Sequence, residues 1–169
     1  MIPCRRRLWR LGLSILPLAG CYASARPGLA PASLPLSRFR ADSSAFTTYS
    51  GIADSTRLVI RDEVRWRDYW RRIHTPFIPP PPVPEIDFAR EMIVVAALGS
   101  RPSAGYDIVI QSAERDSTGI QVVLRRSNPG RGCMVGAAVT QPVDLARLGA
   151  SDLPVRFAER ITTASCGVP

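Results

Sequence analysis

Lysine is absent from this 169-residue sequence, so all 22 basic residues are arginines. The arginines are scattered among 14 acidic residues, whereas a nucleic-acid-binding domain usually carries a clustered basic stripe with interleaved aromatic side chains. The densest group lies between Arg65 and Arg72, where Asp62, Glu63 and Asp68 stand at helical spacing and predict ordinary surface ion pairs. We therefore expect no nucleic-acid partner.

Motifs for catalysis and metal binding are also scarce. His74 is the only histidine, and the chain has no Gly-x-Ser-x-Gly elbow, phosphate loop or dinucleotide fingerprint. His74 falls at the end of a predicted helix, before Pro76, where a capping role is expected. A Ser/His/Asp set around His74 is the alternative. The sequence predicts a non-enzymatic protein with no metal and no cofactor.

No apolar run is long enough to span a bilayer, which takes about 20 residues. The run Leu11–Ala19 follows a basic start of four arginines and ends in Leu-Ala-Gly before Cys21. This pattern resembles the lipobox of bacterial lipoproteins, in which the bond before the cysteine is cut and the new N-terminal cysteine is acylated. We expect a signal peptide at residues 1–20 and lipidation at Cys21. Cleavage after Ala23 or Ala25 without lipidation is the alternative.

The same segment predicts where the protein resides. Tyr22, not aspartate, follows the cysteine, and by resemblance to lipoproteins of bacteria with two membranes this indicates the outer membrane. We expect a protein held in the cell envelope by its N-terminal lipid, on the periplasmic face of the outer membrane or at the cell surface.

Cysteines are few, and four occur in the whole chain. Cys4 leaves with the signal peptide and Cys21 carries lipid, so Cys133 and Cys166 remain. In an oxidising compartment two remaining cysteines usually bond to each other. A disulfide closing a loop of this length contributes about 3–4 kcal/mol. The chain has no C-x-x-C motif, so we predict a structural disulfide.

The chain then divides into a tether and a domain. Residues 21–48 are rich in alanine, proline, serine and leucine, without a helical or strand period, and are predicted to be a flexible tether. Residues 49–169 have a suitable length for one domain with a single core.

A single amphipathic helix is predicted near the start of the domain. Asp62 is its N-cap, and Trp66, Tyr69, Trp70 and Ile73 form one apolar face. A short strand at 57–60 precedes the helix, and the proline-rich run 77–84 follows it as a stiff connector. Docking of that run, with its prolines Pro79–Pro82, into an aromatic groove is the alternative.

Strand patterns dominate the rest of the chain. Residues 92–98, 106–110 and 120–124 are predicted strands joined by turns at 99–105 and 116–119, which favours an antiparallel meander. Further strand candidates are 135–139, 143–145 and 155–158. We predict an α+β fold, in which one helix packs on a mostly antiparallel sheet of five or six strands.

These patterns resemble the C-terminal domain of the PrcB family between Leu58 and Phe157. The resemblance rests on Phe88, Gly99, Pro102 and the Gly105-Tyr106 pair, with support from the Trp70 helix and the Thr140-Gln141-Pro142 segment. The family is named for a lipoprotein that associates with and stabilises a secreted bacterial protease complex. It implies a non-catalytic partner protein.

The function predicted from the sequence is that of an accessory or stabilising subunit that binds an exported protease or another envelope protein. We expect an exposed sheet edge or a turn to make the contact, with the candidate residues Gly99, Arg101, Pro102, Gly105 and Tyr106. A small binding module for a cell-wall or lipid ligand, built on Trp66 and Trp70, is the alternative. A protease inhibitor that presents Arg101 is a weaker variant, because Pro102 follows Arg101.

Overall fold

The computed structural model describes residues 31–39 and 48–166. The predicted signal peptide, Cys21 and part of the predicted tether lie outside these residues. In chain order the elements are β1 (Ala32–Leu34), β2 (Ser37–Arg38), β3 (Thr56–Ile60), α2 (Glu63–Ile73), β4 (Glu91–Ala97), β5 (Asp107–Asp116), β6 (Gly119–Asn128), β7 (Val143–Gly149) and β8 (Val155–Thr163). Within the described part, no helix combines the length and the hydropathy needed to cross a bilayer.

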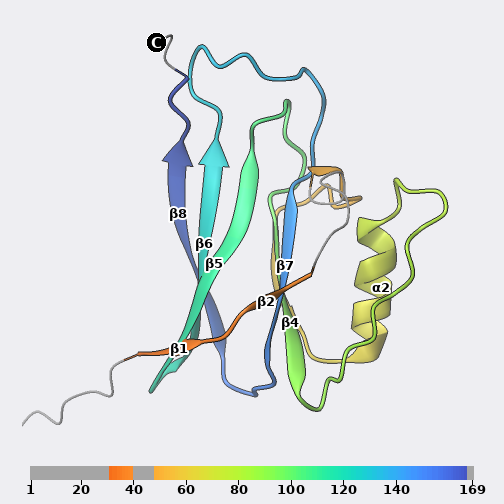
Figure 1. The fold of residues 1–169 in the computed structure, drawn as a ribbon, viewed down its shortest axis with the longest axis vertical. Helices are drawn as coiled ribbons and strands as arrows, with labels where there is room; N and C mark the ends of the chain where they lie inside the picture. Colours follow the sequence, from red (N-terminus) through yellow and green to blue (C-terminus); the bar gives the residue numbers. More distant parts are fainter. Residues whose placement is uncertain (1–30, 40–47, 167–169) are drawn as a thin grey trace, which may run out of the picture.

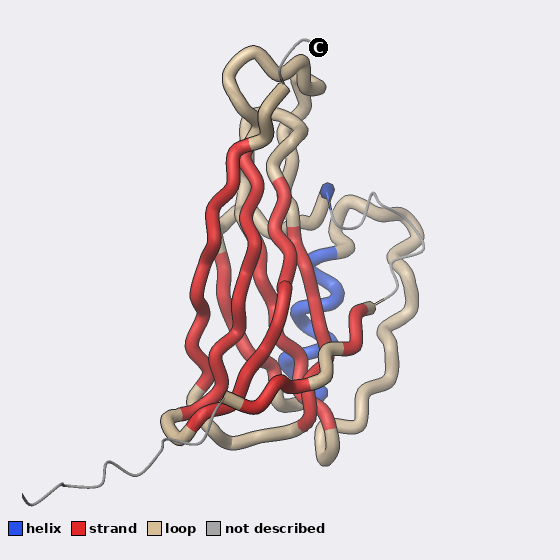
Figure 2. Tube along the Cα trace, turned by 60° about the vertical axis from the view of Figure 1, so that its left-hand side comes forward, coloured by secondary structure: helices blue, strands red, loops and turns tan. Residues whose placement is uncertain are grey.

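The strands form two four-stranded sheets that pack face to face (Figure 1). Sheet A has the order β1-β5-β6-β8, and sheet B has the order β2-β7-β4-β3. One apolar core lies between the sheets, and a second lies between sheet B and α2. Figure 2 shows the helix on the side of sheet B, so the outer face of sheet A carries no described helix.

The position of β4 explains why residues 92–98 are almost continuously apolar. Successive side chains of a strand point to opposite faces of the sheet. One set enters the core between the sheets: Met92, Val94 and Ala96. The other set enters the core beneath α2: Ile93, Val95 and Ala97. Because both faces are covered, the predicted buried strand is confirmed.

The predicted helix is confirmed as α2. The Asp62 carboxylate accepts a hydrogen bond from the backbone N–H of Arg65 at 2.8 Å, which satisfies one of the free donors of the first turn. The buried side chains of α2 are those of the predicted apolar face: Trp66, Tyr69, Trp70 and Ile73. These side chains attach the helix to sheet B.

The proline-rich segment is an ordered connector that runs along α2. The indole N–H of Trp66 donates to the carbonyl oxygen of Pro84 at 2.9 Å, and that of Trp70 donates to Pro81 at 3.2 Å. The two tryptophans are 1% and 8% exposed. The chain's own tryptophans therefore hold this segment in place.

The expectation of one sheet with a meander is wrong. β5 and β6 are antiparallel neighbours as predicted, but β4 pairs with β3 and β7 in the other sheet. β8 pairs with β6 in parallel, because β7 lies between them in sequence and belongs to sheet B. Strand periodicity shows which face of a strand is buried, but it does not show which strands pair.

Residues 32–38 form two short strands, where the sequence analysis predicts a flexible tether. β1 pairs with β5 and β2 pairs with β7, both antiparallel. The segment therefore crosses from sheet A to sheet B along one side of the sandwich (Figure 1), and we call residues 31–39 the strap. Strands of two and three residues are too short to show an alternating pattern in the sequence. They form because they pair with strands that are distant in the sequence.

Asp144 joins the two sheets beside the strap. From β7 its carboxylate accepts the backbone N–H of Ile110 in β5 at 2.7 Å, where the β5–β6 register shifts between Ile110 and Ser112. Arg38 of the strap donates to the same carboxylate at 3.1 Å and to the carbonyl oxygen of Ile110. Burial raises the pKa of Asp144 above its usual value, and these hydrogen bonds oppose that rise.

Candidate interaction surface at the disulfide end

Three segments converge at one end of the sandwich: residues 98–106 after β4, residues 129–142 after β6 and residues 164–166 after β8 (Figure 1). The register explains their meeting. Ala97 at the end of β4 is opposite Val143 at the start of β7, and Asn128 at the end of β6 is opposite Thr163 in β8. We call these three segments together the disulfide end.

The turn that the sequence singled out supports the neighbouring loop. Arg101 and Thr140 exchange two backbone hydrogen bonds, of 2.7 and 3.0 Å. The Thr140 hydroxyl donates to the carbonyl oxygen of Ser103 at 2.9 Å. The N–H of Ala104 donates to the carbonyl oxygen of Gly136, also at 2.9 Å. These four bonds make the turn and the loop one unit.

The candidate residues of this turn differ in accessibility. Gly99 is buried with a φ of 75°, and a Cβ there would lie 2.6 Å from the carbonyl oxygen of Ala53. Arg101 and Tyr106 are half-buried, and only Pro102 and Gly105 are exposed. Gly99 is therefore needed for chain packing, and the turn offers a partner little surface of its own.

Arg101 points into the fold. Its Nη2 atom donates to the carbonyl oxygen of Leu98 at 2.6 Å, and its guanidinium lies 5.9 Å from the centre of the Tyr106 ring. A protease inhibitor would instead project such a side chain from an accessible loop. The geometry opposes the inhibitor interpretation.

The adjoining loop exposes large apolar side chains. Met134 is 101% exposed, Val139 62% and Val135 38%. The sequence analysis predicts a strand at 135–139, and this is wrong, because these residues form no strand and pairing begins only with the isolated bridges of Thr140 to Arg101 and of Gln141 to Tyr49. Met134 and Val139 thus lie on an ordered loop with most of their apolar surface open to a partner. Because the sequence analysis assigns residues 135–139 to a strand, it does not identify this loop as an exposed apolar surface.

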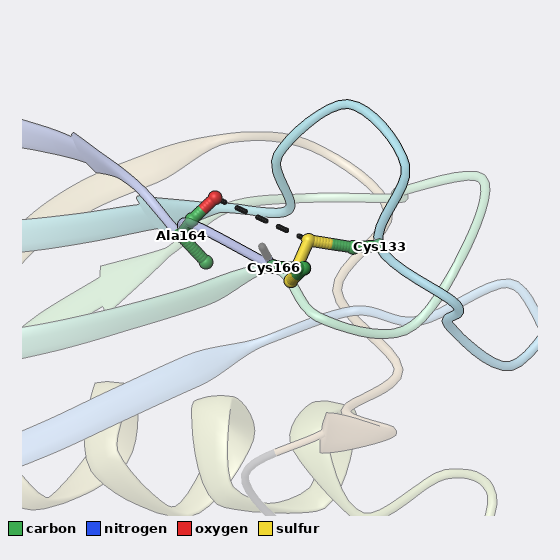
Figure 3. The surroundings of a disulfide bond; sticks show 3 residues. All are labelled: Cys133, Ala164 and Cys166. Carbon is green, nitrogen blue, oxygen red and sulfur yellow. Dashed lines mark hydrogen bonds between the residues drawn. A yellow bond between two sulfur atoms is a disulfide. The ribbon is translucent and has the colours of Figure 1, made fainter. Parts of the chain in front are cut away.

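The disulfide fixes this loop to the end of β8. Cys133 and Cys166 are bonded, with their Cα atoms 5.0 Å apart (Figure 3). The N–H of Ala164 also donates to the carbonyl oxygen of Asn128 at 2.9 Å. The loop is therefore ordered before any partner arrives, so binding loses less conformational entropy.

His74 is a structural side chain. It lies at the C-terminal end of α2, the helix that covers the face of sheet B pointing away from sheet A. It is 3% exposed, its Nδ1 donates to the carbonyl oxygen of Trp70 at 2.9 Å, and its ring centre lies 4.2 Å from that of Trp70. Burial lowers the pKa of His74. It forms the C-cap of α2, as predicted.

The described acidic, cysteine and histidine side chains form no cluster that could hold a metal ion. Across residues 31–39 and 48–166, no three of them lie close enough together to hold an ion. The outer face of sheet A has a shallow depression of about 540 Å³, with a mainly polar lining of Gln111, Ser112, Glu114, Gln121, Val123 and Arg160. No histidine or cysteine lines it.

A family model described as PrcB C-terminal matches residues 92–148. This part of the chain is similar to the PrcB C-terminal family. No curated protein and no solved structure matches the chain. The match confirms the resemblance seen in the sequence.

The PrcB segment runs from β4 to β7 and contains both the supporting turn and the apolar loop. Cys133 lies inside the segment, whereas its partner Cys166 lies beyond it. The disulfide therefore ties the PrcB segment to β8, a strand outside the matched region.

Proposed function

We propose that this protein is a lipid-anchored, non-catalytic accessory subunit of the cell envelope that binds and stabilises an exported protein of the protease class. The PrcB family supports a stabilising role toward a protease complex. The observation that carries the proposal is the apolar loop of the disulfide end, which is ordered by a disulfide and by backbone bonds to the turn.

The exposed side chains of the loop provide binding energy. Complete burial of a methionine or valine side chain contributes about 1.5–3 kcal/mol. Met134 and Val139 are more than half exposed, so a partner that covers both gains much of this energy. Few residues usually dominate an interface, and these two are the best placed here.

The path of the chain bears on where the proposed lipid anchor would lie relative to the apolar loop. Ala32 of the strap pairs with Arg115, close to the β5–β6 turn, whereas Cys133 follows the other end of β6. A ten-residue strand such as β6 is about 33 Å long. With lipid at Cys21, the chain would enter the domain at one end and the apolar loop would lie at the other.

The alternative function, a small module that binds a cell-wall or lipid ligand through Trp66 and Trp70, is not supported by the positions of these side chains. Trp66 and Trp70 are buried between sheet B and the proline-rich segment. Neither ring is available to a ligand without displacement of that segment.

The decisive experiment is affinity purification from crosslinked native membranes with the full chain. We expect a stoichiometric exported protein with wild type, and at least about tenfold less with Met134→Asp or Val139→Asp, since each places a charge in the interface. Val64→Asp is the matched control, because Val64 is 79% exposed on α2. Absence of any co-purified protein would overturn the proposal.

The anchor has a separate test. Cys21→Ser should move the protein from the membrane fraction to the soluble fraction, because acyl chains supply the membrane affinity. Retention of the variant on membranes would contradict lipidation at Cys21.

A further inference from the structure

Among residues 31–39 and 48–166, no strand pairs with the outer edge of β8 in sheet A. β8 has nine residues and stands last in the strand order, with β6 as its neighbour. The opposite edge strand of the sheet, β1, has three residues. A long unpaired edge presents a row of backbone donors and acceptors that can pair with another chain.

The hydrogen bonds at the two ends of the β6–β8 ladder identify the free groups. The N–H of Ile120 donates to the carbonyl oxygen of Pro154, and the N–H of Ala164 donates to that of Asn128, both at 2.9 Å. In a parallel ladder, alternate residues direct both their N–H and their C=O to the same neighbour. Even-numbered residues of β8 therefore face β6, and the backbone groups of Phe157, Glu159 and Ile161 point away from the sheet.

The outer face of this edge carries two arginines, Arg156 and Arg160, and Glu114 lines the same depression as Arg160. Arg156 and Arg160 pair with Gln121 and Arg125 of β6. Arg156 has Asp116 within 3.3 Å, but Arg160 makes no ion pair with any described residue. An incoming strand would place its side chains about 5 Å from these arginines.

We infer that the β8 edge is the docking site for an extended acidic segment of the partner protein, which adds a strand to sheet A. The inference rests on the proposed function and extends it, because β8 leads directly through residues 164–166 to the disulfide end. One partner can thus cover the apolar loop and continue along β8.

The spacing of the arginines specifies the segment. Arg156 and Arg160 are two outward positions apart, so side chains four residues apart in an added strand can lie opposite both. A carboxylate opposite Arg160 would neutralise an arginine that has no ion pair among the described residues, and the second carboxylate would share Arg156 with Asp116. The partner segment should therefore be extended and carry two carboxylates four residues apart on one face.

A second copy of this chain fits the edge poorly. A two-fold pairing centred on Ala158 places Arg156 opposite Arg160 of the copy, and one centred on Arg160 places the two Arg160 residues opposite each other. Like charges directly opposite destabilise a strand pair, so the registers centred on Ala158 and on Arg160 are disfavoured.

Glu159 does not block an incoming strand. Its carboxylate accepts from Nε of Arg57 at 2.8 Å and thus faces β3 of sheet B. Its charge is partnered inside the sandwich, and its backbone groups stay available at the edge.

The test is a titration followed by ¹⁵N NMR, with the full exported chain carrying Cys21→Ser. The probe is a ten-residue peptide of alternating threonine and valine with glutamate at its third and seventh positions, and its twin carries lysine there. We expect the amide signals of Phe157, Glu159 and Ile161 to shift with the acidic peptide, and affinity for the twin to be at least about tenfold weaker. Equal affinity for both peptides, or shifts confined to other residues, would overturn the inference.

Three variants separate the edge from the charge. Ile161→Pro removes an outward N–H that the β6 ladder does not use, and it should weaken binding at least about tenfold, while Ile161→Thr keeps the N–H and should stay within roughly twofold. Arg160→Glu should abolish the preference for the acidic peptide. If Ile161→Pro disturbs the fold, Arg160→Glu alone decides, and unchanged preference there contradicts the inference.

Co-purification distinguishes this inference from the proposed function. Capture of the same exported protein by wild type and by Arg160→Glu at equal yield would leave the accessory-subunit proposal standing and refute the edge site. Failure of wild type to capture any protein would refute the function itself, while the peptide titration would still report on the edge.

Discussion

The two long sides of the sandwich are closed by different means. On one side, the strap pairs with both sheets, and the Asp144 carboxylate bonds to Arg38 and to the backbone N–H of Ile110. On the other side, β3 and β8 face each other, and Arg57 and Glu159 form the ion pair between them. Both sides use an arginine and a carboxylate, but only the first adds backbone pairing.

This difference indicates which side is structural and which is open to a partner. The Asp144 side chain is 15% exposed and that of Glu159 is 31% exposed. A buried carboxylate that satisfies a backbone donor is difficult to replace, whereas a partly exposed pair contributes little. The strapped side is therefore fixed, while the β8 side keeps its backbone groups free.

The largest effect should come from the disulfide, which holds the end of β8 on the open side. Cys133→Ser combined with Cys166→Ser should lower the free energy of unfolding by about 3–4 kcal/mol. Urea denaturation of the double variant and of wild type under oxidising conditions measures the difference. A loss below about 1 kcal/mol would show that the hydrogen bond from Ala164 suffices to hold this end.

Truncation of the two carboxylates tests the comparison directly. Asp144→Ala should lower the free energy of unfolding by about 2–3 kcal/mol, because it leaves the Ile110 N–H without its acceptor. Glu159→Ala should cost about 1 kcal/mol or less, because the pair is partly exposed. Equal losses in urea denaturation would mean that the two sides are closed equally well.

The pH dependence of stability sharpens the comparison further. The pKa of Asp144 is raised in the folded state, so its contribution to stability increases as the pH falls toward the ordinary value of 3.8. The pKa of His74 is lowered, so its contribution decreases as the pH falls below 6.5.

Denaturation series at several pH values resolve these opposite slopes. Asp144→Asn should remove the gain in stability near pH 4 and His74→Gln should remove the loss below pH 6.5. Unchanged slopes in both variants would show that other groups dominate the pH dependence.

Local patterns predicted much of this fold. The helix is encoded by the Asp62 cap and by four apolar residues at helical spacing. The turn after β5 is encoded by Asp116, whose side chain accepts the N–H groups of Thr118 and Gly119 at 2.6 and 3.0 Å. The disulfide pairing followed from counting cysteines, because only two remained.

Features that depend on distant partners were missed. Residues 99–106 carry the chain from sheet B to sheet A, yet a turn of that length is equally compatible with a hairpin. The strap has too few paired residues to show a period. Val135 and Val139 favour a strand, but the disulfide and the bonds to the turn hold residues 135–139 in a loop.

The sequence analysis placed the candidate contact in the turn after β4, and it did not identify the exposed residues of the neighbouring loop. The turn bonds to that loop through Arg101, Ser103 and Ala104. The sequence analysis assigns Val139 to a strand and does not single out Met134, and no local pattern distinguishes an exposed valine in a loop from one in a strand.

The strap also determines how the domain would respond to tension on its N-terminal chain. Pulling there would act first on β1 and then on β2, which are held by few residues each, and release of residues 31–39 would lengthen the chain by about 30 Å. The step would withdraw Phe39 from Trp66 (ring centres 5.2 Å apart), Leu34 and Leu36 from the core between the sheets, and Arg38 from Asp144. We expect the strap to be the first part of the domain to yield under load, well before the surfaces at the opposite end are disturbed.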